Sequence, residues 1–442
     1  MKETTVKYPF LTREVKIYEQ DNGHKIVLAY KEGGMVNVSS WVKTGSINEN
    51  DKNNGISHFL EHLMFKGTHK HPAGEFDHIL ESKGAIVNAA TWKDYTFYYV
   101  TLPKGENNEN FNLAIELHAD MMTDPVVPDY EMGAPFDVND KTVVDKRERH
   151  VVIEEIRMRR DQPWTKVYNA INHAMYTSHP YKRDVIGTPE IISQVSQEDI
   201  MNYYRTFYSP QNVTTIIVGE FDFDEVLEKV KKEFDWGERP IPPARNLQPD
   251  KPTQETIYIE DEANINSSFM MFGYLGVPAR DLKNLIALEM LAIILGEGTS
   301  SRLYVNLVEN IDENIFNMID AENYSFRDGS NFFVQANFNS QYKEKAIELI
   351  KTEIEKLKVN ITERELNKAK KKLKSRFACE VETVSEIGES IGYYMTVCDD
   401  LDLAEQYIPI CESITVEDLQ NVAIRFLNIN NAVISVLQPK SS

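Results

Sequence analysis

The sequence predicts an α+β fold made of two homologous repeated domains, each a mixed β-sheet with helices packed on one face. The first observation is a helix–turn–strand pattern that occurs at residues 195–218 and again at 414–436. Asp199 of the first copy matches Asp418 of the second, 219 residues further on. Repetition at a constant spacing is the sequence signature of a duplicated structural unit.

A second pair of segments repeats the start of the domain. A strand containing Gly45 precedes a helix that ends near Gly67, and a strand that ends near Gly276 precedes a helix that ends near Gly298. Both pairs of glycines are 231 residues apart, so the first copy is shorter in this region or the second carries an insertion or deletion. Each copy is expected to run as strand, helix, further strands and helices, and then helix and strand, which is an α+β order.

A proline-rich, polar stretch joins the two copies, as is typical of a linker between domains. It reads GERPIPPARNLQPDKPTQ. We therefore expect a first domain at residues 1–236, a linker at 237–252 and a second domain at 253–442.

The composition excludes several classes of protein. The formal net charge of the 442 residues is −21, whereas a nucleic-acid-binding protein needs a basic surface. No run of 18 apolar residues occurs, so no membrane span is expected. The N-terminal residues lack the apolar core of a signal peptide, and the three cysteines match no zinc ribbon or redox pair. We expect a cytoplasmic protein with reduced cysteines.

The segment GISHFLEHLMF predicts a zinc site on one helix face. His58 and His62 are four residues apart, so both imidazoles point the same way and can reach one tetrahedral zinc ion. Glu61 borders this face, where a carboxylate can take a proton from a zinc-bound water. H-x-x-E-H is the inverted form of the H-E-x-x-H zinc motif.

The second copy lacks these residues. Glu289, Ala292 and Ile293 stand where the first copy has its histidine, glutamate and second histidine. The fold therefore does not require the polar set of the first copy, and a function in metal binding is indicated. The alternative is two histidines that lie on a helix surface by chance.

A hydrolytic zinc ion needs a third protein ligand and an open fourth position. The segment ERHVVIEEIRM reads as a helix in which Glu148 and Glu155 are two turns apart and share a face. Glu154 points roughly 100° away. From the residues alone, the ligand could be Glu154 or Glu155, and a solvated charged helix is the alternative.

Together these motifs resemble those of the pitrilysin, insulysin and mitochondrial processing peptidase family. The resemblance rests on HFLEHLMFKGT, GAIVNAATWKDYTFYYV and ERHVVIEEIRMRRDQP, with FYSPQNVTTIIVGEF and LGEGTSSRL further along. It covers nearly the whole chain. The zinc motif, the NA-x-T strand and the glutamate helix are specific to the family in combination.

The resemblance implies a role for each residue of the metal centre. His58, His62 and Glu155 would bind zinc, and Glu61 would be the general base. Glu148 would be an outer acid that orients the site, as metal centres need.

The resemblance also implies how a substrate is held. Asn88 and Ala89 would lie on an edge strand whose backbone pairs with the substrate as an added strand. Because strand addition needs an extended chain, the expected substrates are unstructured peptides or short proteins. The implied reaction is hydrolysis of a peptide bond by water activated at zinc.

One departure from the family is an insertion. His62 and Glu155 are 93 residues apart, more than is usual in the family, and the excess lies at residues 132–145. A surface loop can hold such an insertion at modest entropic cost, so Glu155 remains the expected ligand.

A second departure concerns groups that hold the substrate near the zinc. Many family members carry an Arg and a Tyr after the SSRL segment, where this chain has Val308 and Ile315. Neither side chain can donate a hydrogen bond. Some members split the zinc site and the Arg/Tyr pair between subunits, so we expect the catalytic subunit of a heterodimer whose homologous partner supplies the pair. The alternative is a homodimer in which Arg302 or Tyr304 is the donor.

The competing function is a non-catalytic peptide-binding or assembly subunit of a larger complex. The intact set of His58, Glu61, His62 and Glu155 counts against it. The missing Arg/Tyr pair favours it if no partner exists.

Overall fold

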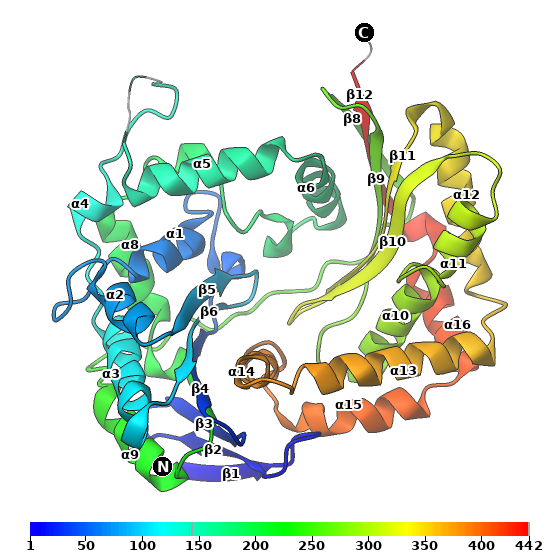
Figure 1. The fold of residues 1–442 in the computed structure, drawn as a ribbon. Coiled ribbons are helices and arrows are strands. Elements are labelled where there is room, and N and C mark those ends of the chain that lie inside the picture. Colours follow the sequence, from blue (N-terminus) through cyan, green and yellow to red (C-terminus); the bar gives the residue numbers. More distant parts are fainter. Residues whose placement is uncertain (141, 143–144, 441–442) are drawn as a thin grey trace. The chain divides into compact units, whose positions relative to one another are not determined.

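We describe the protein from a computed structural model, of which residues 1–140, 142 and 145–440 are described (Figure 1). Residues 141, 143 and 144 of the predicted insertion lie outside the described residues.

The chain forms two compact units, and neither is continuous in sequence. The first holds Met1–Arg157, Asp184–Asn246 and Ala378–Glu405, and the second holds Met158–Arg183, Leu247–Phe377 and the chain from Gln406 onward. The predicted domain boundaries rest on the sequence repeat and stay a prediction. Between Glu233 and Ile257, a range that includes the predicted linker, the chain forms no helix or strand.

The first unit contains a seven-stranded mixed sheet. Its strands are β1 (Lys2–Val6), β2 (Val15–Glu19), β3 (Lys25–Tyr30), β4 (Met35–Val42), β5 (Ile86–Thr91), β6 (Thr96–Pro103) and β7 (Val213–Gly219). Their order is β1-β2-β3-β7-β4-β6-β5, and only β3 and β7 pair in parallel. Strand β5 therefore lies at the edge of the sheet.

Helices cover the sheet of the first unit. They are α1 (Ile56–Met64), α2 (Glu75–Ser82), α3 (Glu109–Thr123), α4 (Asp129–Met132), α5 (Glu148–Asp161), α7 (Pro189–Ile192), α8 (Gln197–Phe207), α9 (Phe223–Glu233) and α14 (Val384–Tyr393), with the last turn of α5 in the second unit. Alternate residues of a strand face opposite sides of its sheet. In β4, Val36 and Val38 join the core beneath α1 and α3, whereas Trp41 faces α14 on the other side.

The second unit contains a five-stranded sheet. Its strands are β8 (Ile257–Ala263), β9 (Ser268–Leu275), β10 (Phe316–Ser325), β11 (Ser330–Phe338) and β12 (Val433–Pro439). Their order is β10-β11-β9-β12-β8, with β12 and β8 parallel. Its helices are α6 (Pro163–Met175), α10 (Leu282–Leu295), α11 (Arg302–Tyr304), α12 (Lys343–Lys356), α13 (Glu363–Cys379), α15 (Asp402–Ser413) and α16 (Val416–Phe426), with the start of α15 in the first unit.

The two sheets confirm the predicted α+β class with mixed sheets. In each, a parallel pair (β3–β7 or β8–β12) is followed by three antiparallel strands that end in an edge strand, β5 or β10. The helices do not lie on one face alone. Helix α14, from the second half of the sequence, packs on the first sheet, and α6, from the first half, packs on the second. Among the described residues, no helix combines the length and apolar character needed to cross a membrane.

Candidate metal centre

Helix α1 begins at a buried carboxylate that caps its N-terminus. Glu49 accepts hydrogen bonds from the backbone N–H groups of Gly55 at 2.7 Å and Ser57 at 2.9 Å. These donors have no partner within a helix, and the helix dipole favours an anion there. Gly55 has φ 96°, and a Cβ on it would lie 2.7 Å from the backbone oxygen of Ile186. Glycine is therefore required where α1 starts.

The apolar residues of α1 orient the helix. Phe59, Leu60 and Leu63 are fully buried in the core, so the helix is held by that face. His58 and His62 are left on the face that meets α5, which lies beside α1 in Figure 1. The predicted helix and the shared face of the two histidines are both present.

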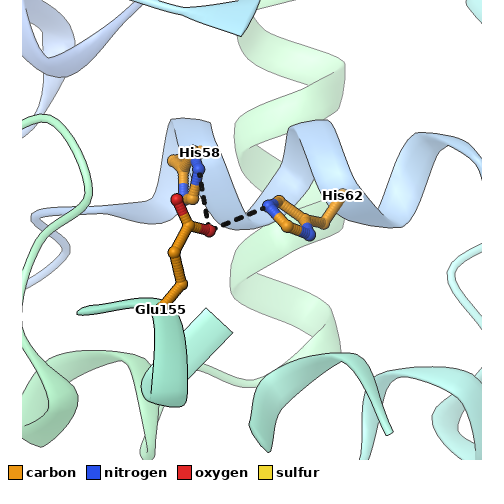
Figure 2. A group of neighbouring side chains, drawn as sticks. All are labelled: His58, His62 and Glu155. Carbon is orange, nitrogen blue, oxygen red and sulfur yellow. Dashed lines mark ion pairs between the residues drawn. The ribbon is translucent and has the colours of Figure 1, made fainter. Parts of the chain in front are cut away.

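Three side chains converge in the manner of a metal site. Figure 2 shows His58 and His62 of α1 directed at Glu155 of α5. The Nε2 atoms of both histidines lie 3.6 Å from Glu155 Oε2, and the three potential ligand atoms lie within 4.8 Å of one another. Ligands of a tetrahedral zinc ion with bonds of about 2.0–2.1 Å are roughly 3.3 Å apart, so the set is close to a coordination geometry.

The two adjacent glutamates of α5 have different surroundings. The side chain of Glu154 is 61% exposed and forms an ion pair with Arg157 at 2.6 Å. Glu155 faces the two histidines instead. The geometry thus separates two candidates that the sequence left open.

A carboxylate behind His62 orients its ring. Glu148 Oε1 lies 3.0 Å from His62 Nδ1, and its Oε2 lies 2.7 Å from Lys66 Nζ. Burial acts to raise the pKa of Glu148, but the hydrogen bonds from His62 and Lys66 outweigh it and hold that pKa below its ordinary value. An ionised Glu148 that accepts the Nδ1 proton leaves Nε2 to face Glu155.

The surroundings of His62 favour a cation. Burial acts to lower its pKa, but Glu148, Glu155 and the charge of Glu61 together raise it to about 9. A cluster of carboxylates that stabilises a proton on an imidazole also stabilises a metal ion that replaces this proton. Two imidazoles and one glutamate are moreover a common ligand set of catalytic zinc, so the residues fit this ion.

Glu61 is held from the edge of the sheet. Thr91, the last residue of β5, donates its hydroxyl to Glu61 Oε2 at 2.6 Å. Glu61 lies one position before His62 on α1, and its charge reaches that ring. Glu61, the general base predicted from the sequence, thus lies next to the candidate metal centre.

The predicted substrate-pairing residues lie on the edge strand. Asn88 and Ala89 belong to β5, which pairs with β6 alone among the described strands. The backbone N–H of Ala89 donates to its neighbour's side chain, Asn88 Oδ1, at 2.9 Å. An added strand that uses this N–H must displace the Asn88 side chain.

Sequence reasoning did not single out Arg149, which anchors α5. Its guanidinium is fully buried and donates to the backbone oxygens of Gly133 at 3.1 Å, Val195 at 2.8 Å and Ile192. Burial, with a contribution from Arg147, lowers its pKa to about 10. Arg149 is one of four arginines in this charged helix, and nothing in the local sequence marks it as the buried one. Thr91 and Lys66 were missed as well, although each belongs to a motif already recognised.

Val308 and Ile315, which stand where many family members carry the Arg and Tyr that hold the substrate, lie in the second unit. Val308 is half-buried and Ile315 is fully buried. Arg302, an alternative donor, is engaged by both oxygens of Glu365 at 2.6 and 2.9 Å. This ion pair weighs against Arg302 as a group that reaches a substrate.

Two family models match the chain. Residues 25–189 match the model described as insulinase (peptidase family M16), and residues 194–373 match the model described as the peptidase M16 inactive domain. The first match contains His58, Glu61, His62 and Glu155.

Known proteins are similar over almost the full chain. The chain is 30% identical to a zinc protease, PqqE, of Helicobacter pylori over 95% of this chain and 91% of that protein. It is 23% identical to a mitochondrial-processing peptidase subunit beta of Dictyostelium discoideum, over 98% of this chain and 90% of that protein. A crystal structure of a protease from Helicobacter pylori matches with a TM-score of 0.83 and 28% identity, covering 99% of both chains.

Proposed function

Because the chain belongs to peptidase family M16, the insulinase family, we propose that it is a zinc-dependent endopeptidase that hydrolyses unstructured peptides or short proteins. The observation that carries the proposal is the convergence of His58, His62 and Glu155 within 4.8 Å. The name of the Helicobacter pylori relative, a zinc protease, supports it.

Each residue of the centre has a proposed role. His58, His62 and Glu155 hold the zinc ion, which, when bound, polarises the peptide carbonyl and acidifies a water molecule. Glu61 takes a proton from the attacking water as general base. Glu148 accepts the Nδ1 proton of His62 and so keeps Nε2 directed at the ion.

The edge strand β5 receives the substrate. An extended chain pairs with the backbone at Asn88 and Ala89, which brings a peptide bond past Glu61 because Thr91 of the same strand contacts this carboxylate. A folded segment cannot pair in this way, so selection for unstructured chains follows from the strand edge.

The active form is a heterodimer in which this chain is the catalytic subunit. The side chains of Val308 and Ile315 cannot donate hydrogen bonds, and Arg302 is paired with Glu365. Removing an oxyanion donor typically costs about 10²–10³ in rate, so a partner that supplies donors has a large effect. The Dictyostelium discoideum relative is named as a subunit, which is consistent with this arrangement.

A second candidate function is a non-catalytic peptide-binding or assembly subunit. The match of residues 194–373 to the inactive-domain model and the absence of donors at Val308 and Ile315 favour it. Peptide turnover separates the two functions, whereas zinc content does not.

The test is cleavage of a quenched mixed-peptide library by the zinc-loaded chain. The chain is assayed alone, with a homologue that lacks H-x-x-E-H but carries the Arg and Tyr, and as Glu61→Gln. Cleavage that needs the homologue and disappears in Glu61→Gln establishes the heterodimeric peptidase. Cleavage by the chain alone rejects the heterodimer, and no cleavage in any combination supports the binding subunit.

A further inference from the structure

The hydrogen bond between Thr91 and Glu61 joins two parts of the centre that have different tasks. The distance from Thr91 Oγ1 to Glu61 Oε2 is 2.6 Å, within the range of a hydroxyl bonded to a carboxylate. Glu61 belongs to the helix that carries the histidines, and Thr91 belongs to the strand that is proposed to receive the substrate.

The strand fixes the direction of the Thr91 side chain. Thr91 ends β5 directly opposite Thr96 of β6, and the next residue, Trp92, donates its N–H to the backbone oxygen of Tyr95 at 2.8 Å. By strand alternation, Thr91 shares with Ala89 the sheet face on which α1 packs. A threonine has a single side-chain torsion, and its β-branch restricts this torsion, so the position of its hydroxyl is well defined.

The carboxylate of Glu61 has no such rigidity of its own. Glutamate has three side-chain torsions, and the terminal one is broad, so an unrestrained carboxylate samples many orientations. Glu61 is part-buried, so solvent reaches part of its side chain. A hydrogen bond to one of its oxygens limits the rotation of the whole group.

We propose that Thr91 is the positioning residue of the general base, and that it holds the Glu61 carboxylate at a set place relative to a peptide paired with β5. The proposal rests on the proposed function and adds to it a residue that acts through Glu61. Strand β5 then positions both the substrate, by backbone pairing, and the Glu61 carboxylate, through Thr91. The hydrogen bond from Thr91 thus keeps the Glu61 carboxylate at a constant distance from a peptide bond that is paired with β5.

The test compares Thr91→Val, Thr91→Ser and a matched control, Thr96→Val. Valine keeps the shape of threonine and removes the hydroxyl, whereas serine keeps the hydroxyl. Thr96 lies opposite Thr91 in the same hairpin and donates its hydroxyl to the backbone oxygen of Thr44 at 2.9 Å. Its replacement therefore reports the cost of losing a hairpin hydroxyl that does not bond Glu61.

We expect Thr91→Val to lower kcat by about 10- to 100-fold, with KM and zinc content within about 2-fold of the wild type. Thr91→Ser should restore kcat to within about 3-fold, because the donor is restored. Thr96→Val should lower the melting temperature with little change in kcat. A fall in zinc content, or equal losses of kcat in Thr91→Val and Thr96→Val, would mean that Thr91 has only a structural role.

Crystal structures of the zinc-loaded wild type, Thr91→Val and Thr91→Ser provide a readout that does not depend on activity. The Glu61 carboxylate should move or lose density in Thr91→Val and stay in place in Thr91→Ser. A carboxylate that stays in place in Thr91→Val overturns the proposal, even if the chain cleaves no peptide. Absence of cleavage by the wild type, both alone and with the homologue, refutes only the proposed function.

Discussion

At the scale of single residues, the candidate metal centre depends on which of two adjacent glutamates faces α1. Glu154 and Glu155 have the same chemistry, but one pairs with Arg157 in solvent and the other lies 3.6 Å from both histidines. Roughly 100° of rotation per residue around a helix produces this difference. The two positions form a natural matched pair for testing the ligand set.

We predict that Glu155→Gln loses zinc and Glu154→Gln keeps it. A neutral amide is a much weaker zinc ligand than a carboxylate, so the affinity of Glu155→Gln should fall by more than about 100-fold. Competition with a fluorescent zinc chelator measures this. Equal affinities of the two variants would exclude Glu155 as a ligand.

Replacement of Glu148 should have a smaller effect on the same measurement. The carboxylate accepts from His62 at 3.0 Å and Lys66 at 2.7 Å, so its proposed role is to orient His62 rather than to bind the ion itself. We expect Glu148→Gln to weaken zinc binding by about 10- to 100-fold, which is typical of such outer partners. An affinity equal to that of the wild type would show that His62 keeps its orientation without Glu148.

Two fully buried histidines make the stability of the chain depend on pH. His24 and His118 each have a ring nitrogen near a hydroxyl, Thr215 at 2.9 Å and Ser40 at 3.0 Å, and burial lowers the pKa of both to about 3. In the unfolded chain their pKa is near 6.5, so below that pH the unfolded state binds protons that the folded state does not. Stability should therefore fall between pH 6.5 and pH 3, by about 1.4 kcal/mol per pH unit for each histidine.

Urea unfolding at a series of pH values tests this prediction. His118→Gln should reduce the slope of stability against pH between 6.5 and 4.5, whatever it does to stability at pH 7.5. The control is His69→Gln, because the His69 side chain is 70% exposed. If stability depends on pH equally steeply in His118→Gln and in the wild type, His118 does not contribute to the pH dependence.

At the scale of elements, helix α14 approaches the first sheet through two glycines one turn apart. A Cβ on Gly392 would lie 2.0 Å from the Trp41 side chain, and one on Gly388 would lie 2.5 Å from Asn37 Oδ1. Real Cβ contacts essentially never come this close, so the helix must shift or the side chains must move. Backbone packing at this spacing is what allows a helix from the second half of the sequence to cover a sheet of the first.

We predict that Gly392→Ala destabilises the first unit. Alanine favours a helix by about 1 kcal/mol over glycine, but forcing extra atoms into a packed core typically costs about 1–3 kcal/mol and the site cannot give way easily. Thermal unfolding and limited proteolysis of segment 378–405 measure the outcome. Gly34→Ala is the control, since no atom lies within 4 Å of its added Cβ. A melting temperature for Gly392→Ala at or above that of Gly34→Ala would contradict the prediction.

At the scale of the whole molecule, the two units share an arrangement of strands, but only the first carries the H-x-x-E-H motif on the helix that follows its strand. Glu289, Ala292 and Ile293 occupy α10 where the first unit has its metal motif on α1. Ala292 and Ile293 are buried, so this helix serves its core. The repeated fold thus packs in both copies, although α10 lacks the histidines and the glutamate of the motif on α1.

The proposed heterodimer makes a prediction at this scale. Mixing the chain with a homologue that carries the Arg/Tyr pair should give a complex of two subunits by light scattering. Peptide turnover per zinc ion should rise by about 10²–10³ over the chain alone. A partner whose Arg and Tyr are replaced should still bind without raising turnover, which separates assembly from donor supply. A stable, fully active homodimer would contradict the heterodimer.

Local sequence patterns were sufficient for the fold class, the repeat and the metal motif. A spacing of four residues places His58 and His62 on one helix face through short-range geometry, and strand alternation assigns the two faces of β4 in the same way. These features depend on neighbours in the chain, so they can be read from it. The choice of Glu155 over Glu154 needed the family resemblance, because helix geometry separates their directions but does not say which direction faces α1.

Long-range packing decides the remaining features. Thr91 and Glu61 are 30 residues apart, and Lys66 and Glu148 are 82 residues apart (148 − 66). Arg149 donates to backbone oxygens that lie 16, 43 and 46 residues away in the sequence. Helices α6 and α14 each cover a sheet built mainly from the other half of the sequence. No local pattern encodes such contacts, because their free energy comes from burial and hydrogen bonds between segments that meet only in the folded chain.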